Sequence, residues 1–325
     1  MYISTLAYCE LFATDLSFHS MPGLTKLESL NLNCCNCIAD ADMRAISGLD
    51  NLKSLQISSS KVTDYGVSFL KALKKLTLLN MEGCPVSSAC LEPLSALGAL
   101  LYLNVSRCNF TDDGCDKFAG LANLESLNLD SCRIGDEGLK NLAGLGNLES
   151  LNLSFTAVTD GGLRKLSGLS SLKFLNLDAR HITDNGLAFL SSLTGLTHLD
   201  LFGARITDSG AKHLRCFKNL RSLEICGGLL TDDGVKNIKD LTCLTVLNLS
   251  QNHQLTDKSL ESISGLTHLV SLNLSNSRVT SRGLRHLKPL KNLKSLTLES
   301  CIVAANDIRN LQSTVLPGLV SFRPQ

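Results

Sequence analysis

Pairs of apolar residues separated by a single residue recur along the chain at a nearly fixed interval. The first pair is Leu30 and Leu32, and the last is Leu296 and Leu298. Successive pairs lie 24 residues apart, except for two steps of 25, which gives twelve repeats in register. Apolar residues at every second position predict a short strand with one buried face. The constant interval indicates that each repeat folds as the same unit.

A second pattern follows each predicted strand. Thr-Asp pairs precede segments whose apolar residues are spaced by three or four, such as Leu187, Leu190 and Leu193. The threonine oxygen suits a helix cap, and the aspartate suits the positive end of the helix dipole. The pairs are Thr63-Asp64, Thr159-Asp160, Thr183-Asp184, Thr207-Asp208 and Thr231-Asp232. Each repeat is therefore predicted to be one strand followed by one helix.

Such a unit cannot bury its leucines alone, so neighbouring repeats must stack. Stacked strands need about 4.8 Å per repeat, whereas stacked helices need about 8–10 Å. The sequence thus predicts an α/β solenoid bent into a horseshoe, with a parallel sheet on the concave side and helices on the convex side. We expect residues 24–325 to form this solenoid, with a terminal strand near Phe322. Residues 1–23 fit as a degenerate N-terminal cap or partial repeat, with Leu6 at a strand position.

The chain has 13 cysteines, and several of them recur at one repeat position. Cys35, Cys84, Cys108, Cys132 and Cys301 stand three residues after the second apolar residue, where Thr156 and Asn252 occur in other repeats. Small residues here can turn inward and bond the loop backbone. A metal or redox site would need converging thiols, so we interpret these cysteines, and the cluster Cys34-Cys35-Asn36-Cys37, as structural. We expect no metal and no cofactor, and reduced thiols favour the cytoplasm or nucleus.

Charge and hydropathy restrict the partners that we expect. The net charge of +1 provides no global field for nucleic acid or an anionic membrane. We expect no signal peptide and no membrane-spanning segment, because the first residues include Glu10 and Asp15 and no apolar window approaches about 20 residues. One basic group lies near the C-terminal end: Arg278, Arg282, Arg285, Lys288, Lys291 and Lys294. We interpret it as a solvated face on the helix and loop side, with a patch for nucleic acid or an acidic partner as the alternative.

Two segments, LANLESLNLDSCRIGDEGLKNLAGL and LTGLTHLDLFGARITDSGAKHLRCF, carry a family resemblance. They resemble the cysteine-containing and ribonuclease-inhibitor-like subclasses of leucine-rich repeats. The region of about residues 24–322 is similar to the repeats of plant F-box/leucine-rich-repeat proteins. The resemblance implies substrate recognition for an SCF-type ubiquitin ligase, with ligase components as further partners. No F-box-length helical segment precedes the first repeat, however. The G-x-I-P signature of the extracellular plant subclass is also absent.

The residues before, between and after the paired leucines are expected to face the concave surface. Most are Ser or Asn, but three adjacent repeats present Phe174, Asn176 and Asp178, then His198, Asp200 and Phe202, then Ser222, Glu224 and Cys226. Tyr102, near Glu82 and Arg107, is a lesser candidate. Aromatic and charged residues clustered on a bland surface resemble an interface. The predicted partner-binding residues are Phe174, Asp178, Arg180, His198, Asp200, Phe202, Arg205, Glu224 and Tyr102. Ordinary sequence drift on an exposed face is the alternative.

Catalysis has little support in the sequence. His198 and Asp200 share a predicted strand, and Cys226 lies about two strands away, but no recognisable nucleophile or phosphate-loop motif accompanies them. The repeated T-D-x-G is a helix cap. We therefore expect a non-enzymatic module that binds a protein on its concave face. A free-standing intracellular scaffold or inhibitor is the alternative, and a hydrolytic enzyme is a remote one.

Overall fold

A computed structural model describes residues 5–7, 24–178 and 180–323 of the chain. The chain divides into two compact units, Met1–Val158 and Thr159–Gln325. The expected cap over residues 1–23 lies outside the described residues, except for the strand β1 (Thr5–Ala7).

In the described part of the first unit, seven three-residue strands pair in parallel and in chain order. They are β1, β2 (Ser29–Asn31), β3 (Ser54–Gln56), β4 (Leu78–Asn80), β5 (Tyr102–Asn104), β6 (Ser126–Asn128) and β7 (Ser150–Asn152). The α-helices between them are α1 (Asp40–Ile46), α2 (Asp64–Val67), α3 (Leu91–Leu94) and α4 (Asp136–Lys140). Short 3₁₀ helices complete the unit: η2 (Leu24–Lys26), η3 (Ser68–Ala72), η4 (Ser88–Cys90), η5 (Cys115–Gly120) and η6 (Asn141–Gly144).

The second unit repeats the same plan. Its strands are β8 (Phe174–Asn176), β9 (His198–Asp200), β10 (Ser222–Glu224), β11 (Val246–Asn248), β12 (Ser271–Asn273), β13 (Ser295–Thr297) and β14 (Ser321–Arg323). Its α-helices are α5 (Asp160–Leu163), α6 (Asp184–Phe189), α7 (Asp208–Ala211), α8 (Asp232–Val235), α9 (Asp257–Ile263) and α10 (Ala305–Thr314). Its 3₁₀ helices are η7 (Arg164–Gly168), η8 (Leu190–Ser192), η9 (Lys212–Cys216) and η10 (Ser281–Leu287).

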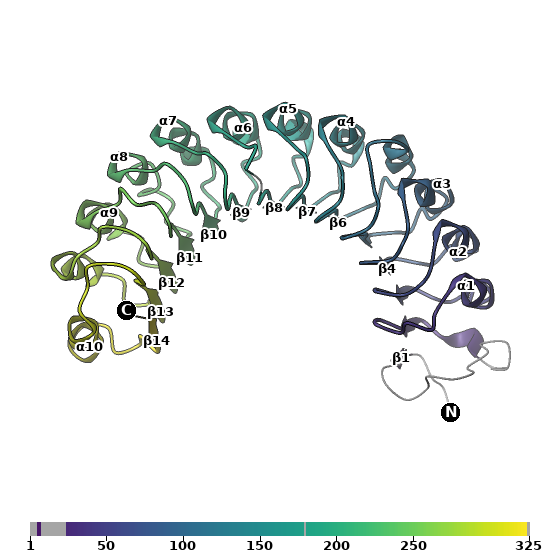
Figure 1. Ribbon diagram of the computed structural model, residues 1–325, viewed down its shortest axis with the longest axis horizontal. Coiled ribbons are helices and arrows are strands. Elements are labelled where there is room, and N and C mark those ends of the chain that lie inside the picture. Colours follow the sequence, from purple (N-terminus) through teal and green to yellow (C-terminus); the bar gives the residue numbers. More distant parts are fainter. Residues whose placement is uncertain (1–4, 8–23, 179, 324–325) are drawn as a thin grey trace. The chain divides into compact units, whose positions relative to one another are not determined.

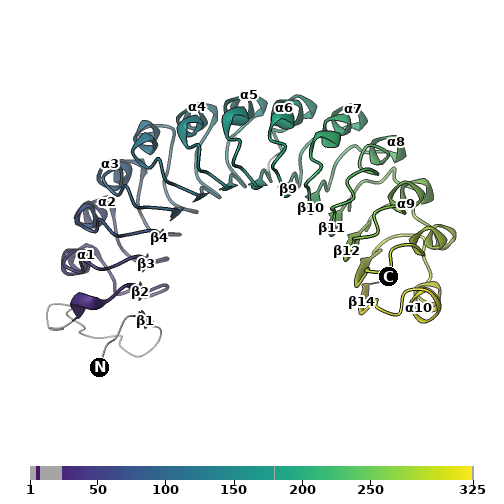
Figure 2. The ribbon, with the colours of Figure 1, turned by 180° about the vertical axis from the view of Figure 1, so that it is seen from behind.

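The strand register follows the leucine pattern. Leu199 lies opposite Leu175 on one side and Leu223 on the other, and all three are buried. Within each unit the strands lie on the inner side of the curve and the helices on the outer side (Figures 1 and 2). The predicted α/β solenoid of strand–helix repeats is confirmed. The expected terminal strand is β14, whose Phe322 pairs with Leu296.

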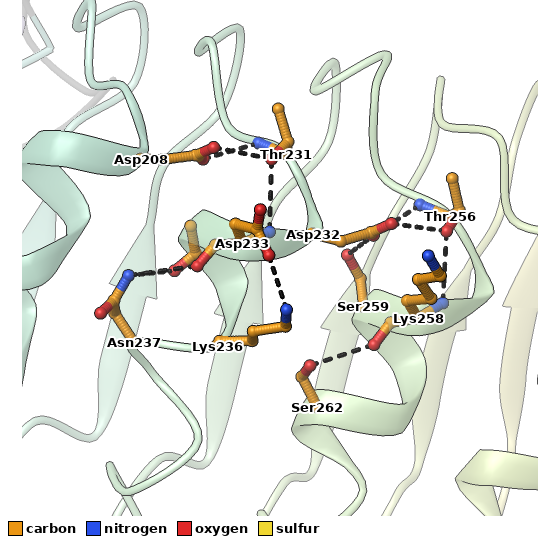
Figure 3. A network of polar contacts seen from close by, with 11 residues as sticks. Asp208, Thr231, Asp232, Asp233, Lys236, Asn237, Thr256, Lys258, Ser259 and Ser262 are labelled. Carbon is orange, nitrogen blue, oxygen red and sulfur yellow. Dashed lines mark hydrogen bonds and ion pairs between the residues drawn. The ribbon is translucent and has the colours of Figure 1, made fainter.

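The Thr-Asp pairs form a link between repeats as well as a cap. Thr231 is the N-cap of α8, and its hydroxyl accepts the backbone N–H of Asp233, as the sequence predicts. Asp208, from the preceding repeat, accepts both the backbone N–H of Thr231 at 2.9 Å and its hydroxyl at 2.7 Å (Figure 3). The glycine of T-D-x-G makes room for this carboxylate: a Cβ on Gly234 would lie 2.3 Å from Asp208 Oδ1.

The recurring cysteines also bond the backbone of the preceding repeat. Cys108 Sγ donates to the carbonyl of Met81 at 3.2 Å, and Cys132 Sγ donates to that of Val105 at 3.2 Å. Burial raises the pKa of the Cys108 thiol to about 12 and that of Cys132 to about 11. The cysteines among the described residues are free thiols. The predicted inward orientation and backbone bonding are therefore confirmed for Cys84, Cys108, Cys132 and Cys301, whereas Cys35 is only half-buried.

Candidate functional site

Three neighbouring strands of the second unit bring the predicted aromatic residues together. Phe174 on β8 lies opposite His198 on β9, which lies opposite Ser222 on β10. The Phe174 and His198 rings are 5.9 Å apart between centroids, with 36° between their planes. Both side chains are exposed. Because strand residues at one register position share a face, the two rings form a small platform on the inner side of the unit.

Asp200 stands at the next outward position of β9. Its Oδ1 accepts the backbone N–H of Phe202 at 2.9 Å, a bond that closes the end of the strand. In the preceding repeat, Asn176 Oδ1 receives the N–H of Asp178 in the same way at 3.0 Å. Asparagine therefore supplies this bond without a charge. The negative charge of Asp200 is additional to what the fold requires.

The surroundings of Asp200 disfavour its ionised form. Burial is the main cause that raises its pKa from 3.8 to about 6, and the carboxylates of Glu224 and Asp178 raise it further. Glu224 lies directly opposite Asp200 in the register. Its Oε2 accepts a hydrogen bond from Asn248 Nδ2 at 3.1 Å. We call Phe174, Asp178, His198, Asp200, Phe202 and Glu224 the β8–β10 patch.

Phe202 lies beside this carboxylate just beyond the end of β9. Its side chain is 39% exposed. The equivalent position, two residues after the end of β10, β11 and β12, holds the buried residues Cys226, Ser250 and Ser275. The next residue, Gly203, has a φ of +73° and donates its N–H to the carbonyl of Cys226 at 3.0 Å. The left-handed turn thus places an exposed phenylalanine at the rim of the β8–β10 patch.

The two predicted arginines lie beyond the strands. Arg180 occupies the repeat position of the buried cysteines, yet its side chain is exposed. A Cβ on Gly203 would lie 3.8 Å from both Arg180 Cγ and Asp178 Oδ1, so these residues come together next to Phe202. Arg205 is exposed in the loop between β9 and α7, where its backbone N–H donates to the Ile182 carbonyl at 2.8 Å.

The prediction that Cys226 faces the concave surface is wrong. Its side chain is fully buried, with Sγ 3.7 Å from the Asn248 carbonyl, and burial raises the pKa of the thiol to about 11. Small residues after the second leucine turn inward because the strand has ended. His198 Nδ1 lies 2.8 Å from Thr197 Oγ1, while Asp200 bonds Phe202. These three side chains do not form the hydrogen-bonded chain that a nucleophile and its base require.

Tyr102 belongs to the first unit. It is 45% exposed on β5, and Arg107 and Glu82 form an ion pair of 3.7 Å between Nη1 and Oε1. Sequence reasoning missed Phe155 in the same unit, which is 66% exposed with a φ of +53°. The signal was available, since Phe155 occupies a position that holds Ser or Gly in most other described repeats.

Neither a metal centre nor a membrane-spanning helix occurs in the described part of the chain. Among the described residues, no group of three or more His, Cys, Asp or Glu side chains is arranged to hold a metal ion. In the same part of the chain, every helix is too short or too polar to span a bilayer.

Comparisons with known proteins agree on the fold. Two leucine-rich-repeat family models match, one over residues 17–86 and 218–279, the other over 100–119, 120–143, 147–167 and 193–214. An internalin from Listeria monocytogenes is 27% identical, with a TM-score of 0.69, over 92% of this chain and 80% of that one. A leucine-rich-repeat protein from Leptospira interrogans is 18% identical, with a TM-score of 0.58, over 91% and 84%.

A third solved structure shares the same architecture. The plant peptide hormone receptor RGFR1 in complex with RGF2 is 17% identical, with a TM-score of 0.52, and the match covers 93% of this chain and 55% of that one. No curated protein sequence matches this chain significantly.

Proposed function

This chain belongs to the leucine-rich-repeat family, and we propose that it is a non-catalytic module that binds a partner protein through the β8–β10 patch. One observation carries the proposal: exposed rings and carboxylates gather on three adjacent strands. The strands β11, β12 and β13 present only Val, Asn, Ser and Thr at their outward positions. Exposed aromatic side chains with adjacent charges are typical of the anchor residues of protein interfaces.

The charges of the patch support binding rather than folding as its role. Asp200 keeps a carboxylate where asparagine would satisfy the backbone, and its ionisation is disfavoured by burial and by two neighbouring carboxylates. A cationic side chain of a partner would relieve that cost when it docks. Arg180 and Arg205, exposed at the rim, would contact acidic groups of the same partner. Tyr102 is a separate candidate contact on the first unit.

The burial and hydrogen bonds of His198, Asp200 and Cys226, which a hydrolase would use as base and nucleophile, support binding over hydrolysis. Cys226 is buried and its pKa is raised, so it is neither accessible nor a thiolate near neutral pH. His198 bonds a threonine hydroxyl rather than Asp200. Nucleophilic catalysis needs an activated nucleophile within reach of its base.

The resemblance to F-box/leucine-rich-repeat proteins suggests a more specific role. In that role the chain recognises the substrate of an SCF-type ubiquitin ligase; a free-standing scaffold or inhibitor is the alternative. Affinity capture of the tagged full chain distinguishes them. Recovery of a cullin-type ligase core supports the ligase role, and a single stoichiometric partner without that core supports the scaffold.

We also propose a cytoplasmic or nuclear location. The support is the set of free thiols, which includes the exposed Cys34, Cys37, Cys216 and Cys243. Oxidising compartments convert such thiols to disulfides. Fractionation of cells that produce the tagged chain tests this location, and recovery in the secreted fraction would exclude it.

The binding proposal is tested by replacing one phenylalanine. Phe202→Ala should lower recovery of the captured partner by about tenfold or more, the effect of losing an interface anchor. Phe189→Ala is the matched control, because Phe189 is 36% exposed in the same unit but lies on the helix α6. Equal recovery by both variants would reject the β8–β10 patch as the binding surface. Because Phe189 and Phe202 are both exposed, the melting temperatures of the two variants should stay close to that of the wild type.

A further inference from the structure

The charge of this chain is segregated between its two units. The first unit contains 11 Lys and Arg against 17 Asp and Glu, a formal charge of −6. The second contains 20 Lys and Arg against 13 Asp and Glu, a formal charge of +7. The near-neutral total, which provides no global field for nucleic acid, is therefore the sum of two opposite charges. A strongly basic unit attracts polyanions even when the whole chain is balanced.

The basic residues of the second unit recur at four repeat positions. Each of its seven repeats has an N-cap residue, from Thr159 to Ala304. The fifth, eighth, eleventh and fourteenth residues after these caps hold 13 of the unit's 20 Lys and Arg, and all 13 are exposed. The same positions hold a single acidic residue, Glu261. Within residues 212–221 and 285–294, every third residue is Lys or Arg.

Equivalent positions of successive repeats lie next to each other, because the repeats stack. Within η9, Lys212 and Arg215 lie on the same side, since a 3₁₀ helix has about three residues per turn. Between repeats, the fourteenth positions are hydrogen-bonded in series: Thr245 N–H donates to the Arg221 carbonyl at 2.8 Å, and Lys294 N–H donates to the Val270 carbonyl at 2.8 Å. We call the surface formed by the four positions the basic face. It adjoins the β8–β10 patch at its fourteenth positions, because Thr197 Oγ1 lies 2.8 Å from His198 Nδ1.

Few carboxylates compensate the charge of the basic face. Lys236 pairs with Asp233 at 2.6 Å. Arg285, Lys288 and Lys294, however, have no carboxylate partner in the described part of the chain. The sequence explains this difference, because residues 262–298 contain no Asp or Glu. Exposed like charges held on neighbouring positions repel each other, and a bound polyanion relieves that repulsion.

The other side chains of the basic face identify the polyanion. Nine of its remaining positions hold Ser or Thr. Together with Lys and Arg, these hydroxyls are the side chains that contact phosphate oxygens of nucleic acids. No exposed large apolar or aromatic residue occurs at these positions, which are all described. The face thus lacks the apolar side chains that enter a bilayer, the rings that stack on single-stranded bases and the anchors of a protein interface.

We propose that the basic face of the second unit binds the phosphate backbone of double-stranded DNA without reading its sequence. Its positions belong to equivalent, stacked segments, so no single element is set apart to enter a groove and contact base edges. Recognition of an RNA duplex relies on 2′-hydroxyl contacts across the minor groove, which a face of stacked equivalent segments is not built to make. DNA backbone contact needs only the array of cations and hydroxyls.

Fluorescence anisotropy of a labelled DNA duplex of about 25 base pairs, titrated with the full chain, tests the proposal. For six phosphate contacts, the affinity should fall by about 10³-fold between ~50 and ~200 mM salt. The triple variant K288E/K291E/K294E should bind at least about tenfold more weakly at ~50 mM salt. The control K71E/K74E/K75E makes the same change in net charge with exposed lysines of the first unit, and it should bind as the wild type does.

Lys291 Nζ also donates to the Val315 carbonyl at 3.0 Å, so the double variant K288Q/K294Q keeps that contact and should still weaken binding. Equal losses in both triple variants would overturn the proposal, because the effect would then be one of total charge. Undetectable binding by the wild type at low salt would overturn it too. Tighter binding to an RNA duplex, to polyglutamate or to vesicles with anionic lipids would replace DNA with that partner.

Discussion

The carboxylate of Asp184 receives both the backbone N–H of Thr207, at 2.8 Å, and its hydroxyl, at 2.6 Å. Thr207 caps the helix of the next repeat, so one aspartate fixes the position of its neighbour's N-cap. The same relationship joins Asp208 to Thr231 and Asp257 to Thr280. A residue expected to serve its own helix dipole thus also links successive repeats.

Asp184→Ala should lower the free energy of unfolding by about 2–3 kcal/mol, because the amide and hydroxyl of Thr207 lose a charged acceptor. Urea denaturation followed by circular dichroism measures the loss. Asn185→Ala is the control, since this neighbouring side chain is exposed. A loss no larger than that of the control would show that the link between repeats contributes nothing.

Gly210→Ala should also destabilise the protein by about 2 kcal/mol or more, since overpacked atoms must shift. The added Cβ would lie 2.1 Å from Asp184 Oδ1 and would displace the linking carboxylate. In a helix without such a clash, replacing glycine with alanine stabilises the helix by about 1 kcal/mol. A destabilising effect of Gly210→Ala would therefore be evidence for the clash. Gly168→Ala, which meets nothing within 4 Å, should leave the melting temperature unchanged or raise it. Similar melting temperatures for both variants would contradict the predicted clash.

The sequence predicts the parts of this fold that depend on one repeat. Leucine spacing placed the strands, and Thr-Asp pairs placed the helix caps. The link from Asp184 to Thr207 was not predicted, because it depends on how two repeats stack. The predicted orientation of Cys226 was wrong for a related reason: strict alternation ends with the strand at Glu224, two residues before Cys226. Whether Phe202 contacts a partner is a property of a complex, so the sequence could only indicate it as an exception to the pattern.

The pH dependence of stability should report the environment of Asp200. Because its pKa is raised to about 6 in the folded state, ionisation destabilises the fold as the pH rises from about 4 to about 6, and the cost is fully present above that range. Asp200→Asn retains an acceptor for the Phe202 N–H. It should stabilise the protein at pH 7 by about 1 kcal/mol, since solvent screens the partly exposed carboxylate, and by nothing below about pH 4.

Urea denaturation of both proteins from pH 4 to pH 8 measures this difference. Glu261→Gln, a change at an exposed carboxylate on α9, is the control and should show no such pH dependence. A stability difference for Asp200→Asn that is constant across this range would contradict the raised pKa.

Thiol labelling should separate the cysteines by burial. At pH 8, Cys34, Cys37, Cys216 and Cys243 should react with a disulfide reagent within minutes, because they are exposed. Cys108, whose pKa is raised to about 12, should react only after unfolding in urea. Mass spectrometry of the labelled peptides identifies the sites. Rapid labelling of Cys108 in the native protein would show that the loop around it opens readily.

Site-specific photo-crosslinking in cells shows whether a partner protein contacts the β8–β10 patch. A photoreactive phenylalanine analogue is placed at residue 202 on the β8–β10 patch, and in a parallel experiment at residue 189 on α6. If the β8–β10 patch binds a partner, one partner protein is crosslinked from residue 202 and is absent from the residue 189 sample. Crosslinks that are equal at both positions, or confined to residue 189, would contradict a partner-binding role for the β8–β10 patch.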